Sequence, residues 1–355
     1  MRIVFFFLFT TLLTLSFAED KYRLGEGYRP TKEPIYIAGY LSTVAEIRSY
    51  EQRVALDEMA LMVYGEYSRW GFMSEFETKD YYSKSFEDDY DYYEYDDYNE
   101  DENDDDDEGD GGDTATGTST GSSGEYSNVF YIERLNVRYY FDDNSRIKIG
   151  KFFSEVGFWN TWPINVLRYT TSNPHFVETL FPRMTTGIEY KRYFSDTTLF
   201  VTIQNNDGLD DKYSRLRIDR HYALCLSLDT DGGEWKIGAG QYRQKGAGAV
   251  SNYMTLGYFA GVDEWTFISE GGIKKRDDNT TLAYDIYLQA VWHVVERHDL
   301  SLRLEGYRDI EDLGTSNSVT LGYAYRPRPF MALKSEFDIH DNGPRRLLLS
   351  FSIMF

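Results

Sequence analysis

The sequence predicts an all-β fold, a closed antiparallel transmembrane β-barrel of about sixteen strands with a water-filled lumen. Three observations predict it. From Pro34 onward, segments of about ten residues alternate apolar and polar side chains, as tilted strands that cross a bilayer do. Short polar turns join these segments two by two, and longer connections link one pair to the next. All eight prolines fall before a strand or in a connection, where their missing N–H interrupts no ladder.

The N-terminus carries a predicted export signal. Arg2 precedes an apolar run, Ile3–Phe17, and the exit Ser16-Phe17-Ala18 has small residues at its first and last positions, which predicts a signal peptide over residues 1–18. We expect an N-terminal tail over residues 19–33 and the barrel over residues 34–355. Beyond the signal, no apolar run reaches the roughly 18–20 residues that a membrane-spanning helix needs. The mean hydropathy of −0.53 agrees with that reading.

Sixteen strands are predicted in order along the chain, and an even number allows the barrel to close without leaving an edge. The predicted starts are Ile35, Ala55, Gly71, Asn128, Arg146, Arg183, Leu199, Ile218, Glu234, Ser251, Trp265, Thr281, Leu300, Ser318, Phe330 and Arg346. Their connections are expected to alternate between long and short. The segment Ala60–Phe76 leaves an alternative open, because it could form one bent strand in place of two.

The charged residues fix which face of each strand looks inward. In the segment Phe330–His340, Lys334, Glu336 and Asp338 alternate with apolar residues. A slip by one residue would place these charges in hydrocarbon, at a cost of about 2–4 kcal/mol for a midplane Lys or Arg. The same rule turns further charged residues inward: Arg134, Arg138, Asp285, His293, Arg303 and Glu305. The alternative, a soluble β-sandwich with one solvent-exposed sheet face, would expose too much apolar surface.

The acidity of the chain belongs to one insert. Of the formal net charge of −22, residues 79–125 hold −17, from 19 Asp and Glu against Lys79 and Lys84. This composition predicts an acidic, disordered loop over residues 80–125. It also argues against nucleic-acid binding, which requires clustered Lys and Arg. The insert suggests an alternative function, a surface barrel that captures cations or a partner protein.

No catalytic or metal-binding motif is predicted. Residues 117–121 match G-x-S-x-G, but they lie in the insert without the strand and helix of a nucleophile elbow. The five histidines are scattered, and no window has the ligand spacing of a calcium loop. The single Cys225 cannot form an internal disulfide. We therefore expect no enzyme activity, no cofactor and no metal; an outer-membrane hydrolase on a smaller barrel is the enzymatic alternative.

The chain resembles Gram-negative outer-membrane porins. The resemblance rests on the signal peptide, the alternating segments and the ending FSIMF, in which Phe351, Ile353 and the terminal Phe355 match the family's membrane-insertion signal. It implies a homotrimeric, sixteen-stranded diffusion channel in the outer membrane that passes small hydrophilic solutes and ions. It also implies insertion into the lipid bilayer by the barrel-assembly machinery, with the N-terminal tail in the periplasm and the acidic insert outside the cell.

The resemblance further implies that the third long loop, about Phe153–Pro182, folds into the lumen and forms a constriction. The stretch GKFFSEVGFWN is similar to the entry to that loop in several porin subfamilies, including phosphate-selective ones. The alternative is a loop that packs over the trimer or the rim. Ten residues are candidates for the constriction: Arg134, Arg138, Arg146, Lys148, Glu155, Arg168, His175, Glu178, Arg183 and Lys191. Because basic residues predominate among them, we expect a weak preference for anions.

Overall fold

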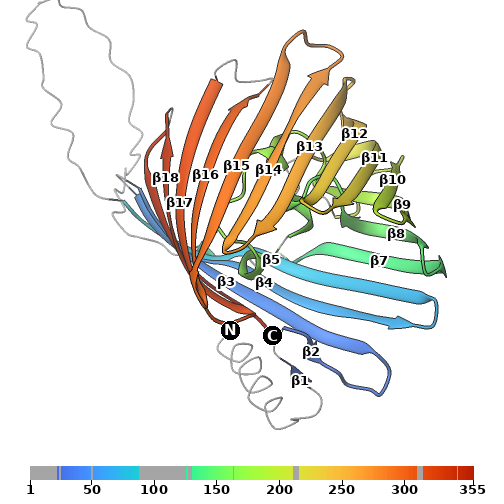
Figure 1. Ribbon diagram of the computed structural model, residues 1–355, viewed down its shortest axis with the longest axis horizontal. Helices are drawn as coiled ribbons and strands as arrows, with labels where there is room; N and C mark the ends of the chain where they lie inside the picture. The colour runs from blue at the N-terminus through green and yellow to red at the C-terminus, as the bar shows by residue number, and fades with distance from the viewer. Residues whose placement is uncertain are drawn as a thin grey trace, which may run out of the picture.

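A computed structural model describes residues 22–23, 25–48, 51–87, 125–126, 130–162, 164–210, 216–309, 315–341 and 343–355. These residues form one antiparallel sheet that closes on itself (Figure 1). Each barrel strand pairs with its neighbours along the chain, and the last strand pairs with the first. The predicted signal peptide and residues 88–124 of the predicted insert lie outside the described residues.

Sixteen strands make up the barrel wall, and each begins within four residues of its predicted start. The strands are β3 (Ile35–Arg48), β4 (Glu51–Tyr67), β5 (Trp70–Glu87), β7 (Tyr131–Asp142), β8 (Ser145–Phe153), β9 (Met184–Phe194), β10 (Thr197–Gln204), β11 (Ile218–Thr230), β12 (Gly233–Gln244), β13 (Val250–Val262), β14 (Trp265–Arg276), β15 (Leu282–Val295), β16 (His298–Arg308), β17 (Thr315–Arg328), β18 (Met331–His340) and β19 (Arg346–Met354). The sixteen-stranded antiparallel barrel is therefore confirmed. The bent-strand alternative is wrong, because a turn at Ser68 and Arg69 separates β4 from β5.

Three two-residue strands accompany the wall: β1 (Tyr22–Arg23), β2 (Gly27–Tyr28) and β6 (Glu125–Tyr126). β2 pairs with β3 near the N-terminal end, and β6 pairs with β5. Both described ends of the predicted insert, residues 80–87 and 125–126, thus continue the sheet.

The connection between β3 and β4 differs from the predicted alternation. A long loop was expected there, but residues 49 and 50 alone separate the two strands. The reason is continued pairing, since β3 and β4 keep their ladder as far as Ile47 opposite Gln52. These strands have 14 and 17 residues, more than the 9–11 or so that a tilted strand needs to cross a bilayer.

The predicted register is confirmed. On β18, Lys334, Glu336 and Asp338 are buried inside the barrel, whereas Leu333 and Phe337 are exposed on its outer face. Inside and outside alternate along each wall strand because successive side chains point to opposite faces of a sheet. The outer face carries a belt of aromatic side chains next to the short turns: Tyr67, Trp70, Tyr139, Phe141, Phe194, Trp235, Tyr258, Trp265, Trp292 and Tyr323.

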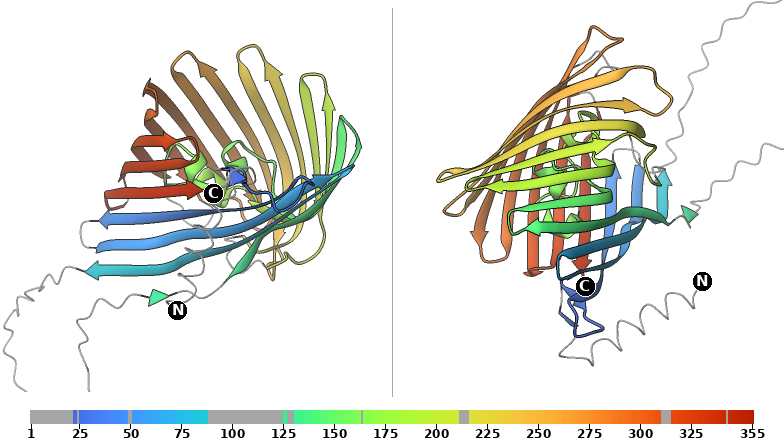
Figure 2. Two further views of the ribbon diagram at one scale, coloured as in Figure 1. Left: turned by 90° about the horizontal axis from the view of Figure 1, so that it is seen from below. Right: turned by 90° about the vertical axis from the view of Figure 1, so that its right-hand side faces the viewer.

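The connection between β8 and β9, residues 154–183, folds back into the barrel; we call it the inner loop (Figure 2). It contains two short 3-10 turns, η1 (Trp159–Thr161) and η2 (Asn165–Leu167), and one helical turn, α2 (Phe176–Thr179). Within the described part of the chain, no helix is long and apolar enough to cross a membrane. The inner loop divides the interior of the barrel into two unlike sides.

Candidate functional site: the lumen beside the inner loop

Three glutamates of the wall hold the backbone of the inner loop. Glu270 on β14 accepts hydrogen bonds from the N–H groups of Phe158 at 2.6 Å and Trp159 at 3.0 Å. On β16, Glu305 accepts the N–H of His175 at 2.5 Å, and on β18 Glu336 accepts that of Thr171 at 2.7 Å. Irregular loops have backbone donors without ladder partners, and burial makes unpaired donors costly. The inward carboxylates supply these partners.

Wall cations hold the loop carbonyls in the same way. Lys334 donates to the backbone carbonyls of Asn165 and Thr170, and to the Asn165 side-chain oxygen at 2.7 Å. Further donors are Lys236 to Gly157 at 3.1 Å, Lys274 to Thr179 at 2.7 Å, Arg303 to Ser172 at 3.0 Å and Arg326 to Arg168 at 2.7 Å. These contacts come from β12 to β18, so that part of the wall carries the loop. The rim-packing alternative for the loop is therefore wrong.

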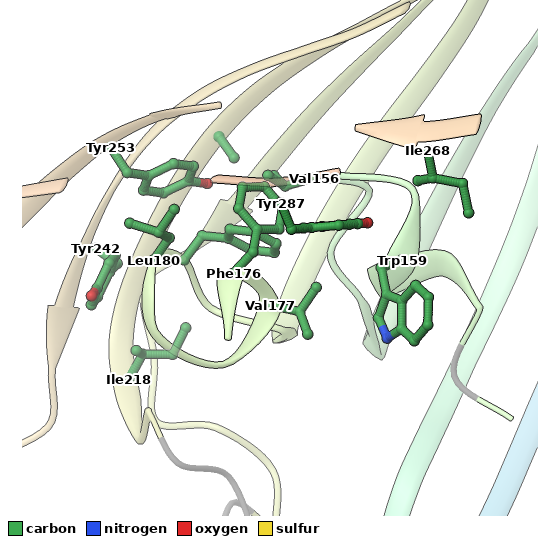
Figure 3. Close-up of a cluster of buried hydrophobic side chains, with 12 residues drawn as sticks. Val156, Trp159, Phe176, Val177, Leu180, Ile218, Tyr242, Tyr253, Ile268 and Tyr287 are labelled. Carbon is green, nitrogen blue, oxygen red and sulfur yellow. The ribbon is translucent and has the colours of Figure 1, made fainter. Parts of the chain in front are cut away.

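Hydrophobic side chains fill the space between the loop and this wall (Figure 3). We call this group the packed cluster. Its members are Val156, Trp159, Phe176, Val177, Leu180, Phe181, Ile218, Ala223, Tyr242, Tyr253, Ile268 and Tyr287. Phe176 is fully buried, and its ring lies 5.3 Å from that of Phe181 and 6.0 Å from that of Tyr287. Within the described residues, this side of the barrel interior is filled by packed side chains.

The opposite side of the lumen contains a cavity of about 420 Å³, which we call the basic cavity. It lies between the inner loop and the strands β4, β5, β7, β8 and β19. Its lining residues are Met62, Tyr64, Met73, Arg134, Asn136, Arg138, Arg146, Lys148, Phe152, Phe153, Glu155, Thr161, Ile164 and Met354. Four of them are cationic and one is anionic, so the lining carries an excess of positive charge.

The four cations differ in how strongly they are neutralised. Lys148 lies 2.8 Å from a carboxylate oxygen of Glu189 and 3.4 Å from one of Glu155. Arg134 forms an ion pair with the buried Glu75. Arg138 lies 3.7 Å from the exposed Glu66.

Arg146 stands apart from the other three, because it makes no ion pair with any described residue. The Nε atoms of both Arg138 and Arg146 also lack a hydrogen-bond partner in the described structure. Arg138 and Arg146 are therefore the two lining cations that nearby carboxylates neutralise least.

Glu155 is the only carboxylate that lines the basic cavity within the described structure. Burial alone would raise the pKa of Glu155, but the positive charges of Lys148, Lys236, Arg146 and Lys191 outweigh burial and lower that pKa below its ordinary value. Glu155 thus remains ionised at neutral pH and offsets part of the positive charge.

The structure brings together half of the ten predicted constriction residues. Arg134, Arg138, Arg146, Lys148 and Glu155 line one cavity. Two more lie beside it. The guanidinium of Arg183 lies 5.3 Å from the ring centre of Phe153. Lys191 lies directly opposite Arg146 in the ladder between β8 and β9.

The remaining three predicted residues lie elsewhere on the inner loop. Arg168 is buried and donates to the carbonyl of Trp162. The Nδ1 atom of His175 lies 2.7 Å from a carboxylate oxygen of Asp285, and its ring stacks on Tyr307 at 3.7 Å. Glu178 accepts a hydrogen bond from the side-chain amide of Asn173. These three side chains hold the loop in place and do not line the basic cavity.

Sequence reasoning missed two groups of residues. The first is the set of wall anchors, Glu270, Glu305 and Glu336, whose inward direction could be predicted but whose partners could not. The second is the apolar part of the cavity, which includes Met62 and Met73. Their inward direction follows from the strand register, but the predicted lining was based on charged residues, and methionine carries no charge.

The residues of the predicted insertion signal lie on the strand that closes the barrel. Ser350 and Ser352 are buried on the inner face of β19, which turns Phe351 and Ile353 to the outside. The backbone of Phe355 exchanges two hydrogen bonds with Gly39, at 2.7 and 2.8 Å. The C-terminus is thus paired to the first wall strand.

No group of three or more His, Cys, Asp or Glu side chains in the described residues is arranged to hold a metal ion. His221 lies fully buried, and its ring nitrogens contact Thr185 and Tyr253. Cys225 is buried and donates to the carbonyl of Glu155. These side chains are packed into the wall and its contact with the inner loop.

Solved structures of outer-membrane proteins share the closed barrel fold of this chain. OmpF of Salmonella typhi, solved in complex with daunomycin, aligns with a TM-score of 0.60 at 9% identity and covers 90% of this chain and 97% of its own. The anion-selective porin from Comamonas acidovorans gives 0.58 at 11% identity and covers 90% and 99%.

The trimer form of the outer-membrane protein OmpT of Vibrio cholerae gives a TM-score of 0.58 at 8% identity, over 90% of this chain and 99% of that one. No protein-family model and no curated protein sequence matches the chain. The chain therefore has the fold of the Gram-negative outer-membrane porins.

Proposed function

We propose that this protein is a porin of a Gram-negative outer membrane, a passive channel through which small hydrophilic solutes and ions diffuse, with a weak preference for anions. The observation that carries the proposal is the division of the lumen. The inner loop seals one side with the packed cluster and leaves the basic cavity open on the other. A narrow passage lined by fixed charge selects solutes by size and by sign of charge. Transport of this kind needs neither a cofactor nor a catalytic step.

The membrane setting follows from the outer face. A soluble protein rarely exposes a continuous apolar band, and the aromatic belt beside the short turns is typical of barrels at a bilayer surface. We extend the proposal to insertion by the barrel-assembly machinery, which would read Phe351, Ile353 and Phe355. We also propose a homotrimer, supported by the trimer form of the similarly folded OmpT.

The anion preference is assigned to the positive lining of the basic cavity. Exposed charges are screened beyond about 8 Å in physiological salt, so the acidic insert would act on the channel mouth and not on the narrow passage. The charge in the cavity then decides selectivity. Arg138 and Arg146 contribute most, because carboxylates neutralise them least.

Reversal potentials in planar bilayers test this proposal. Purified protein in a KCl gradient should pass chloride more readily than potassium. The double variant Arg138→Gln/Arg146→Gln should lower the chloride-to-potassium permeability ratio at least about twofold. Arg192→Gln is the matched control, because Arg192 lies on adjacent β9 but is exposed on the outer face. A protein that opens no ion-conducting pathway would contradict the porin function, and an unchanged ratio would contradict the role of the arginines.

The acidic insert supports a second candidate, a surface barrel that binds cations or a partner. Residues 79–125 hold −17 of the net charge. Deletion of residues 87–124 separates the two functions. Lost binding with unchanged permeability would support the surface role, and lost permeability would assign the insert to the channel.

A further inference from the structure

The basic cavity has an apolar side that diffusion of hydrated ions does not require. Met62, Tyr64, Met73, Ile164 and Met354 line it opposite the cations. They belong to, or pack against, one group of buried apolar residues that includes Ala38, Tyr40 and Val166. Met73, Tyr64 and Met354 are only partly buried, so they present apolar surface to the passage. Apolar surface that faces water costs free energy, and a solute with an apolar part can recover it.

The cationic side of the same cavity also carries aromatic rings. The ammonium group of Lys148 lies 4.8 Å from the ring centre of Phe152, and the guanidinium of Arg134 lies 5.5 Å from that of Phe153. These cation–π contacts add to the carboxylate pairing of the two cations. The Nε atoms of Arg138 and Arg146 are buried and lack a partner among the described residues, so a solute in the cavity would reach these guanidinium groups through their Nη atoms. A guanidinium group binds a carboxylate through two parallel hydrogen bonds.

Gly71 provides the space in which Arg138 lies. Gly71 is directly opposite Arg138 in the ladder between β5 and β7. A Cβ atom at Gly71 would come within 3.0 Å of Arg138 Nε and 3.2 Å of its Nη2. The guanidinium group therefore rests against bare backbone. This contact helps to hold the donor at the edge of the cavity.

We propose, on the basis of the porin function above, that the basic cavity is a binding subsite for small monocarboxylates that carry an apolar group, preferably an aromatic ring. The carboxylate binds Arg138 or Arg146, and the apolar group lies against Tyr64, Met73 and Met354. Thioether side chains adapt to flat rings and make favourable sulfur–aromatic contacts. A cavity of about 420 Å³ accommodates such a solute.

The charge count disfavours multiply charged anions such as phosphate. Of the four cations, Lys148 and Arg134 are already paired with carboxylates at close range. Two less neutralised guanidinium groups suit a single negative charge. A phosphate dianion would also gain nothing from the methionine side of the cavity, because its hydration shell is lost there without replacement.

Benzoate and acetate are the probes that test this proposal, because they share a carboxylate and differ in the apolar group. Each is titrated against the single-channel chloride current of the full-length protein in planar bilayers. Benzoate should reduce the current with a half-saturating concentration at least about fivefold below that of acetate. Benzylammonium, of similar size and opposite charge, should not saturate in the same range.

Variants of one side chain separate the apolar contribution from the charge. In Met73→Gln the half-saturating concentration of benzoate should rise to within about twofold of that of acetate. The reason is that the substitution replaces the thioether with a polar amide of similar length. Met73→Leu should keep the benzoate preference.

The outcomes distinguish this inference from the porin function. Equal half-saturation by benzoate and acetate, in a channel that still prefers chloride to potassium, would overturn the subsite and leave the porin function intact. If benzylammonium reduced the current with the same half-saturating concentration as benzoate, the cavity would bind apolar groups without recognising charge. That result would also overturn the subsite. A protein that conducts no ions would overturn the porin function itself.

Discussion

The two sides of the lumen are built from strands with the same alternation, yet they have opposite properties. On β11 to β15 the inward side chains meet the inner loop and form the packed cluster, in which Phe176 and Ile268 are fully buried. On β4, β5, β7 and β8 they face the basic cavity. The difference lies in the loop and not in the strand pattern. An inward side chain becomes core where the loop covers it, and lines the basic cavity where the loop leaves it uncovered.

The largest expected effect lies in the packed cluster. Phe176→Ala should lower the free energy of unfolding by about 3–5 kcal/mol, because it leaves a cavity among fully buried side chains. Met73→Ala, on the open side, should cost about 2 kcal/mol or less, since Met73 is already partly exposed. Denaturation in detergent micelles, followed by tryptophan fluorescence, measures both. Equal losses would show that the open side is packed as tightly as the closed one.

The next effect concerns an anchor of the inner loop. Glu270→Gln should destabilise the protein by about 1–3 kcal/mol and make the current noisier, because an amide cannot accept from Phe158, Trp159 and Tyr287 together. Glu296→Gln is the control, since Glu296 is exposed and its ion pair with Arg297 lies at the surface. Current recordings and denaturation should agree. A quiet channel of normal stability would mean that the loop does not depend on this anchor.

A smaller effect is expected from narrowing the open side. Thr161→Trp places an indole on the cavity face of η1 and should lower the single-channel conductance at least about twofold. Thr161→Ser retains the hydrogen bond that Thr161 donates to the Phe158 carbonyl and should conduct normally. Full conductance in Thr161→Trp would place the main passage outside the basic cavity.

The smallest effect is the pH dependence that Glu155 contributes. Its pKa is lowered, so it keeps its negative charge as the pH falls through the ordinary glutamate value of about 4.3. The anion preference due to Glu155 should therefore rise only below that pH, when the carboxylate takes up a proton. Glu155→Gln should show the higher preference already at pH 7, by less than about twofold. Reversal potentials of the two proteins would coincide at pH 7 if Glu155 did not act on the passage.

Much of the fold could be predicted from the sequence because strand alternation is a local signal. The sixteen strands and the inward direction of Lys334, Glu336 and Asp338 follow from spacing alone. The site was harder to predict. Arg138 and Arg146 could be assigned to the inner face, but the placement of Arg168 and His175 depends on loop contacts with strands far away in the sequence.

By itself, the sequence determined the number of strands, their register and the sign of the charges on the inner wall, because each depends on neighbours a few residues apart. Only the tertiary structure decided which part of that wall became core and which part lines an open cavity. The reason is that residues 154–183 form hydrogen bonds and packing contacts with residues more than one hundred positions away, as between Phe158 and Glu270. No local sequence pattern specifies such long-range contacts.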